Sequence, residues 1–195
     1  MRLYISKRGG HIVMKQRVMF CVVLMLVLFV GAGTVSASEV PTFELPLLVT
    51  GTGQTPCSLT LHTLVNRLGI QATYDPMIAR ISGYKTVAVA MGASLKGMGA
   101  AGINQEEELE RSQVMFERAK ASGASIIGFH IGEEARRNTI ADRYIEPFLP
   151  LCDLLVVLEK GNQDDLFTKA SEASGVPLIV VADIAELMSL IEEMF

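Results

Sequence analysis

The sequence predicts a doubly wound α/β domain, with a mostly parallel sheet of five to six strands and helices on both faces. Three observations lead to this fold class. Short apolar segments rich in Val and Ile recur without polar alternation, which is typical of strands buried on both faces of a parallel sheet. Segments with helical spacing of apolar residues separate them. Residues 46–195 are also long enough for one domain with a substantial core.

The strands are expected where these apolar segments lie. Residues 75–84, between the second and third segments, are short for a crossover, so the strand order in this region stays open. The segments are PLLVT (46–50), QATY (71–74), KTVAVAMG (85–92), SIIGFHIG (125–132), DLLVVLE (153–159) and PLIVVAD (177–183).

Helices are expected between the strands. Apolar residues at helical steps predict one over 61–68. A longer helix begins at a capping pair of Asn104 and Glu107 and ends at Gly123. Residues 184–195 form the last helix. The alternation of strand and helix along the whole domain favours parallel winding.

The first 37 residues have the pattern of a secretory signal peptide. Lys15 and Arg17 precede the apolar run 18–30, and Val35-Ser36-Ala37 supplies a small-x-small cleavage site. We therefore expect export and cleavage after Ala37. An uncleaved anchor is the alternative, and membrane attachment is expected only through this segment.

Two boundaries complete the domain organisation. Met14 begins a conventional signal, so residues 1–13 are compatible with a mis-called start. Residues 38–45 form an extended lead-in to the single α/β domain at 46–195.

Charge excludes some classes of partner. Five of the 17 basic residues and none of the 21 acidic ones precede Ser38, so the remainder carries 12 basic and 21 acidic side chains, a net charge of −9. Such a surface repels nucleic acid and anionic lipid. No His/Cys/Asp cluster has metal-ligand spacing, and no G-x-S-x-G elbow is present.

The loops predict where a ligand binds. Parallel sheets bind ligands beyond the carboxyl ends of their strands, and here glycine-rich or charged loops follow the first, third, fourth and fifth strands. The loops that enter the strands are short and plain. The candidate ligand contacts are Thr50, Thr52, Gly53, Gln54, Thr55, Ser94, Lys96, Gly97, His130, Glu133, Arg136 and Asn162.

The first two of these loops each have two interpretations. TGTGQT, residues 50–55, runs into a helix start whose free amides favour an anion, or it is only a tight glycine turn. The long loop GASLKGMGAAG, residues 92–102, places Lys96 to neutralise an anion and Ser94 to donate a hydrogen bond, or it is a surface flap.

Residues in the other loops also have more than one interpretation. His130 is an acid–base group, a ligand contact or a packed histidine. Arg136 is held by an anion or by nearby glutamates such as Glu133. Asn162 is explained by helix capping or by binding. Cys57, at a helix start, forms a weakly supported nucleophile pair with His130.

The TGTGQT loop resembles the T-x-T-G-x-T phosphate loop of flavodoxins and stands at the same place between the first strand and the first helix. The resemblance implies that Thr50, Thr52 and Thr55 bind phosphate and that FMN is an alternative cofactor. The chain departs from that family because it has no Trp and no aromatic residue in its third-strand loop. Otherwise we expect no cofactor and no metal.

The domain as a whole is similar to an exported bacterial family, the domain of unknown function 6305. The similarity rests on PLLVTGTGQTP, MGASLKGMGAAGI, GFHIGEEARR and GNQDDLF and covers nearly all of residues 45–195. It implies export and a shared site without naming an activity.

These observations predict an exported domain that binds a small anionic ligand at the carboxyl edge of its sheet, with non-enzymatic binding favoured. Three alternatives stay open. The first is a hydrolase or transferase with His130 as base, the second a flavodoxin-like protein, and the third an envelope module for a protein partner that the sequence does not identify.

Overall fold

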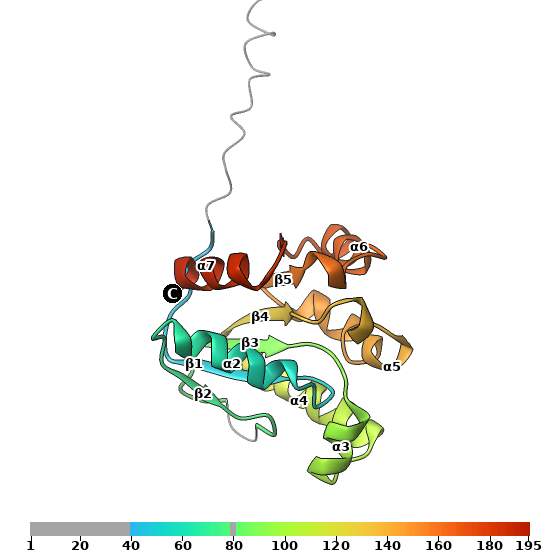
Figure 1. Ribbon diagram of the computed structural model, residues 1–195. Coiled ribbons are helices and arrows are strands. Elements are labelled where there is room, and N and C mark those ends of the chain that lie inside the picture. The colour runs from blue at the N-terminus through green and yellow to red at the C-terminus, as the bar shows by residue number, and fades with distance from the viewer. Residues whose placement is uncertain (1–39, 79–80) are drawn as a thin grey trace, which may run out of the picture. The chain divides into compact units, whose positions relative to one another are not determined.

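Six parallel strands form one sheet in the order β2-β1-β3-β4-β5-β6 (Figure 1). The structure is a computed structural model that describes residues 40–78 and 81–195. The expected signal peptide and its cleavage site lie outside the described residues. The strands are β1 Leu47–Gly51, β2 Ala72–Tyr74, β3 Thr86–Ala90, β4 Ser125–His130, β5 Leu154–Leu158 and β6 Leu178–Val181.

The α-helices lie between these strands and after the last one. They are α2 Cys57–Arg67, α3 Leu95–Ala101, α4 Gln105–Ser122, α5 Thr139–Asp142, α6 Leu166–Ser174 and α7 Ile184–Met194. Three 3₁₀ turns lie near β4 and β5. η1 Glu134–Arg136 follows β4, η2 Glu146–Leu151 precedes β5, and η3 Glu159–Gly161 follows β5. The predicted α/β class, the parallel sheet and all six strand segments are confirmed.

Two apolar layers hold the helices to the sheet. On one face, α2 and α7 pack on alternate residues of the strands, such as Val49 in β1 and Val156 in β5. On the other face, α4, η2 and α6 pack on the intervening residues, such as Leu48 and Leu155. Every residue of β1, β3 and β5 is buried, which explains why those segments show no polar alternation.

The strand order creates a switch point beside β1. This strand pairs with β2 on one side and with β3 on the other, so the connections after β1 and β3 leave in opposite directions. Crevices for ligands form at such points in open parallel sheets. The segment between β2 and β3, whose described residues form no helix, contributes Ile78 and Ile81 to the core. The order that the sequence left open is thus β2-β1-β3.

One predicted loop is a helix. Residues 95–101 form α3, capped by Ser94, whose Oγ accepts from the amide of Gly97 at 3.0 Å, and ended by Gly102 in the left-handed conformation. The interpretation of residues 92–102 as a long flexible loop was therefore wrong. Ser94 is an N-cap residue, and its spacing to Gly102 fits a short helix.

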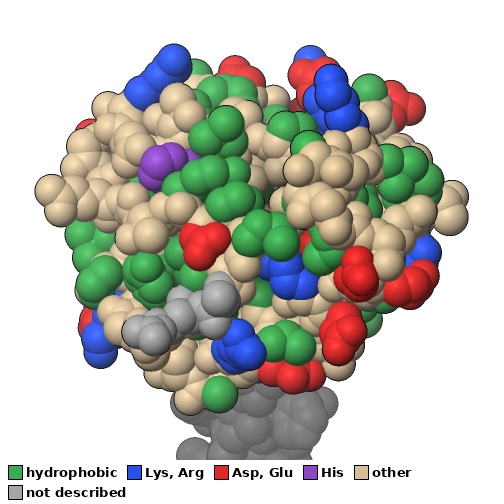
Figure 2. Space-filling view, turned by 90° about the horizontal axis from the view of Figure 1, so that it is seen from below, with side chains coloured by type: hydrophobic (Ala, Val, Ile, Leu, Met, Phe, Trp, Pro, Cys, Tyr) green, Lys and Arg blue, Asp and Glu red, His purple; other side chains and the backbone are tan. Residues whose placement is uncertain are grey.

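The surface shows hydrophobic side chains in several groups among polar ones, as Figure 2 shows for the face seen from below Figure 1. The large exposed apolar side chains come from different elements, for example Leu59 in α2, Leu95 in α3 and Val180 in β6. Among residues 40–78 and 81–195, no helix combines the length and apolarity needed to cross a membrane.

Candidate functional site

The connections after β1 and β3 interlock at the switch point. The amide of Ser94 donates to the carbonyl oxygen of Gly53 at 2.8 Å. A side chain at Gly53 would collide with the carbonyl oxygen of Gly92, and one at Gly97 would collide with that of Gln54. Gly53 also has φ +59, which L side chains rarely adopt. In this structure, these glycines serve a close contact between two loops.

The hydroxyl groups of the TGTGQT loop point into the protein. Thr52 is fully buried, and its Oγ1 donates to the carbonyl oxygen of Tyr144 at 2.7 Å and accepts from the amide of Gly92. The Oγ1 of Thr55 accepts from the amide of Cys57 at 3.4 Å. Thr50 is fully buried, and its Oγ1 has no hydrogen-bond partner. Two of the three hydroxyls are thus committed to internal contacts.

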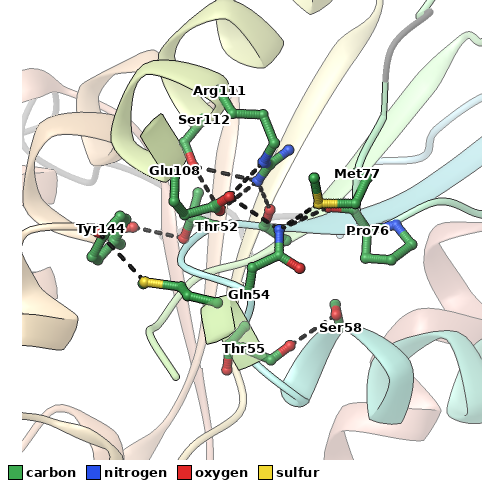
Figure 3. A network of polar contacts seen from close by, with 12 residues as sticks. Thr52, Gln54, Thr55, Ser58, Pro76, Met77, Glu108, Arg111, Ser112 and Tyr144 are labelled. Carbon is green, nitrogen blue, oxygen red and sulfur yellow. Dashed lines mark hydrogen bonds and ion pairs between the residues drawn. The ribbon is translucent and has the colours of Figure 1, made fainter. Parts of the chain in front are cut away.

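A buried ion pair lies against this loop (Figure 3). Glu108 of α4 has no exposed surface, and its carboxylate accepts from Nε and Nη2 of Arg111, both at 2.7 Å. Ser112 Oγ and Gln54 Nε2 donate to the same carboxylate at 3.3 and 3.0 Å. Arg111 Nη2 also donates to the carbonyl oxygen of Gly51 at 2.7 Å, which joins α4 to the end of β1.

Gln54 extends this ion-pair network to a third segment. Its Nε2 lies 3.3 Å from the carbonyl oxygen of Pro76 and 3.2 Å from Sδ of Met77, in the connection after β2. Gln54 itself has φ +51. Because its amide nitrogen braces three segments, its observed role is to fix the geometry of the switch point.

The sequence interpretation missed Glu108 and Arg111. An acidic run at the start of a helix, such as residues 106–110, is ordinarily solvated, but Glu108 is buried. The missed signal is helical spacing: Glu108 precedes Ser112 by four residues and Phe116 by eight, so all three lie on the buried face of α4.

A second network joins the connections after β4 and β5. Arg137 donates from Nε to Asp142 at 2.8 Å and from both Nη atoms to Asp164 at 3.1 and 2.9 Å. Its Nη1 also donates to the carbonyl oxygen of Gly161 at 2.8 Å, and its guanidinium lies 5.2 Å from the ring centre of Phe167. Burial lowers the pKa of Arg137, but the two carboxylates outweigh burial and the pKa is raised.

His130 lies beneath this second network and is 1% exposed. Its Nδ1 is 3.0 Å from the carbonyl oxygen of Met91, which can only accept, so Nδ1 carries the proton in the neutral ring. Nε2 has no partner, and the ring stacks on Phe167 with centres 5.1 Å apart. Burial lowers the pKa of His130, although the Met91 hydrogen bond opposes it.

A hollow of about 300 Å³ lies between η1 and η3, and Gly161 in its lining separates it from His130. Apart from Gly161, its lining residues carry charged or polar side chains. Gly161, which lies directly over the His130 ring, is its one small residue. The lining residues are Glu134, Arg137, Lys160, Gly161, Gln163 and Asp164. A larger hollow, of about 510 Å³, lies between α4 and the α5–η2 segment, with Leu109 and Arg143 among its lining residues.

The other predicted contacts fall into two groups. Asn162 lies three residues before Asp165, the N-cap residue of α6, and its Oδ1 accepts from the amide of Phe167 at 3.0 Å. Oε1 of Glu133 lies 3.4 Å from Nζ of Lys160. Lys96 in α3 and Arg136 in η1 have exposed side chains and make no hydrogen bond or ion pair with the described residues. The carboxyl edge thus has buried arginines that are neutralised and two exposed cations that are not.

Groups for nucleophilic or metal chemistry are not assembled among the described residues. No carboxylate is hydrogen-bonded to His130. Cys57 is half-buried at the first turn of α2, and both it and Cys152 are free thiols. No group of three or more potential metal ligands lies together in residues 40–78 and 81–195.

Comparison with known proteins adds a family but no activity. The family model described as "Domain of unknown function (DUF6305)" matches residues 44–195. No curated protein and no solved structure matches the chain.

Proposed function

Since the chain belongs to the DUF6305 family, whose description names no activity, we propose a function from the site itself. The domain binds a small anionic ligand at the carboxyl edge of its sheet, and Lys96 and Arg136 supply the positive charge. These residues follow β3 and β4, which are neighbours in the sheet. We also propose that the protein is exported, with the mature chain beginning at Ser38.

One observation carries the binding proposal. The two buried arginines at this edge already have carboxylate partners: Arg111 has Glu108, and Arg137 has Asp142 and Asp164. Paired charges attract a further anion only weakly. Lys96 and Arg136 carry no such partner among the described residues, so their charge is available to a ligand.

Arg136 is the better placed of the two exposed cations. The stem of its side chain packs over Gly132 at the end of β4, since a Cβ there would lie 2.6 Å from Cβ of Arg136. Its turn, η1, contributes Glu134 to the hollow, and the next residue is Arg137. An anion bound beside the hollow therefore lies next to Arg136, at the rim of the hollow.

Flavin binding is not favoured by the geometry of the phosphate-like loop. A phosphate would need hydroxyl donors from Thr52 and Thr55. The Thr52 hydroxyl donates its hydrogen bond to the backbone carbonyl oxygen of Tyr144, and the Thr55 hydroxyl is buried beside Gly92. These residues do not fit FMN. A colourless purified protein is the expected result.

The binding proposal is tested by thermal stabilisation with phosphate, sulfate, citrate and malonate. We expect at least one of these anions to raise the Tm of the wild type. Lys96→Ala combined with Arg136→Ala should abolish this shift while leaving the Tm without anion nearly unchanged, because both side chains are exposed.

A matched control separates a site from net charge. Arg67→Ala with Lys120→Ala removes the same two charges from exposed positions near the ends of α2 and α4, at the other edge of the sheet. That double variant should keep the anion response. An equal loss in both double variants, or full retention in both, contradicts the assignment. Export and cleavage after Ala37 are tested by fractionation of the source cells and N-terminal sequencing. Protein confined to the cytoplasm contradicts export, and an N-terminus at residue 1 or 14 in all fractions contradicts cleavage.

A further inference from the structure

We propose that the ligand of the carboxyl edge is a hydroxylated anion, and that one of its hydroxyl groups donates a hydrogen bond to Nε2 of His130. This inference rests on the proposed anion site and assigns the adjoining hollow between η1 and η3 to the hydroxylated part of the ligand. The candidate class comprises hydroxy acids and phosphorylated polyols.

Nε2 of His130 is a buried polar atom without a hydrogen-bond partner among the described residues. A buried polar group without a partner costs about 1–3 kcal/mol, and native proteins contain few of them. Nε2 of His130 is such a group, in a side chain that is 1% exposed. Because Nδ1 donates to Met91, Nε2 holds a lone pair and requires a donor. A bare carboxylate or phosphate dianion supplies none, whereas a hydroxyl group does.

One residue, Gly161, lies between Nε2 of His130 and the hollow. A Cβ on Gly161 would lie 3.1 Å from Nε2 and 2.6 Å from Cδ2 of His130. Gly161 also lines the hollow, so only its backbone separates Nε2 from that space. The turn is held there by the Arg137 hydrogen bond to the carbonyl oxygen of Gly161. For a ligand hydroxyl to reach Nε2, η3 has to move outward and release the hydrogen bond from Arg137 to Gly161.

The lining of the hollow suits a hydroxylated molecule. Glu134 carries a carboxylate with no partner among the described residues. Gln163 donates from Nε2 to the backbone carbonyl oxygen of Glu159 at 3.1 Å, and its own side-chain oxygen accepts from no described residue. Lys160 adds an ammonium donor at the same wall, whereas the guanidinium of Arg137 is already paired with Asp142 and Asp164. Adjacent donors and acceptors, with no aliphatic or aromatic residue in the lining, favour hydroxyl groups over an aliphatic ligand.

The experiment compares probes that differ only in hydroxyl groups. D-Glycerate and propionate share a carboxylate and three carbons, and glycerol supplies hydroxyls without charge. With ¹⁵N-labelled protein, long-range ¹H–¹⁵N spectra report the proton on Nδ1 and the free lone pair on Nε2. We expect D-glycerate and glycerol to shift the Nε2 resonance and propionate to leave it in place. D-Glycerate should bind about threefold to tenfold more tightly than propionate, as one neutral hydrogen bond allows.

The His130→Asn variant is the control, because Asn can still donate to Met91 but lacks a group at the Nε2 position. It should lose the preference for D-glycerate over propionate and keep the response to propionate. A melting curve for this variant shows whether it folds. If it does not fold, the wild-type Nε2 spectra alone decide the question.

The outcomes separate the two proposals. If propionate and D-glycerate stabilise equally and neither D-glycerate nor glycerol shifts Nε2, the hydroxyl inference is overturned and the anion site stands. If glycerol shifts Nε2 while no anion stabilises the protein, the anion site fails and the hydroxyl contact stands. An Nε2 resonance already typical of an accepted hydrogen bond, unmoved by any probe, shows an internal water and overturns the inference.

Discussion

Replacing Glu108 with Gln tests the buried ion pair at the switch point. The carboxylate accepts four hydrogen bonds, two of them from Arg111 at 2.7 Å, and Glu108 has no exposed surface. Gln retains one acceptor oxygen and turns an NH₂ group toward two donors. Arg111, whose side chain is 11% exposed, then keeps a charge with no counterion.

The expected cost is large for a single isosteric change. Removing one partner of a buried pair costs about 3–5 kcal/mol, against a total stability of about 5–15 kcal/mol. For a domain of this size each kcal/mol lowers Tm by about 2–4 °C, so a fall of about 10 °C is expected. Glu108→Leu with Arg111→Met should cost much less than the single change, because both charges then leave together.

Urea unfolding followed by circular dichroism measures these changes. Glu110→Gln is the control, since Glu110 lies on the exposed side of the same helix and should change stability by less than about 0.5 kcal/mol. A Glu108→Gln variant within that range of the control would refute the reasoning. It would mean that the pair contributes little beyond what neutral packing supplies.

Three further predictions follow from the packing and the titratable groups. Gly161→Ala should destabilise the fold by about 1–3 kcal/mol in urea unfolding, because its methyl group would meet the carbonyl oxygen of Gly132 at 2.5 Å and the His130 ring at 2.6 Å. Gly99→Ala in α3 should instead be neutral or stabilise by up to about 1 kcal/mol, since nothing lies within 4 Å of its new Cβ. Equal effects of the two substitutions on stability would contradict the close packing at Gly161. Burial raises the pKa of the Cys152 thiol, so iodoacetamide should modify half-buried Cys57 and spare Cys152 in the folded protein. Peptide mass spectrometry measures the labelling of each thiol, and rapid labelling of Cys152 would disprove its burial. The pKa of His130 is lowered from 6.5 by burial, so below pH 6.5 the unfolded chain binds more protons and the free energy of unfolding should fall, by at most about 1.4 kcal/mol per pH unit from this group. His130→Asn should flatten that fall between pH 6.5 and 5, and an unchanged slope would contradict it.

The local features of the fold were predictable from sequence because they depend on neighbours along the chain. The capping pair of Asn104 and Glu107 begins α4 as expected, with both reciprocal hydrogen bonds, and Gly123 ends it in the left-handed conformation. The apolar segments became strands because residues buried on both faces cannot alternate in polarity. The 92–102 segment shows the limit of such reasoning, since its glycines masked a short helix.

The candidate site was predictable only as a location. Parallel strands bring every loop that follows a strand to one edge, so the sequence placed Lys96, His130 and Arg136 at that edge. It did not show which charges were already paired. Arg136 and Arg137 are adjacent in the chain, yet Arg137 meets Asp142 and Asp164 while Arg136 faces solvent.

The sequence by itself determined the elements, their order and the edge where chemistry can gather, because periodicity, caps and glycines act within a few residues. Only the tertiary structure decided the strand order beside β1, the burial of Glu108 with Arg111, and the unpartnered Nε2 of His130. Each of these depends on which surfaces meet across the sheet. A helix face, a carboxylate or an imidazole carries no local mark of what will cover it, so contacts between distant segments determine whether it braces the fold or remains open to a ligand.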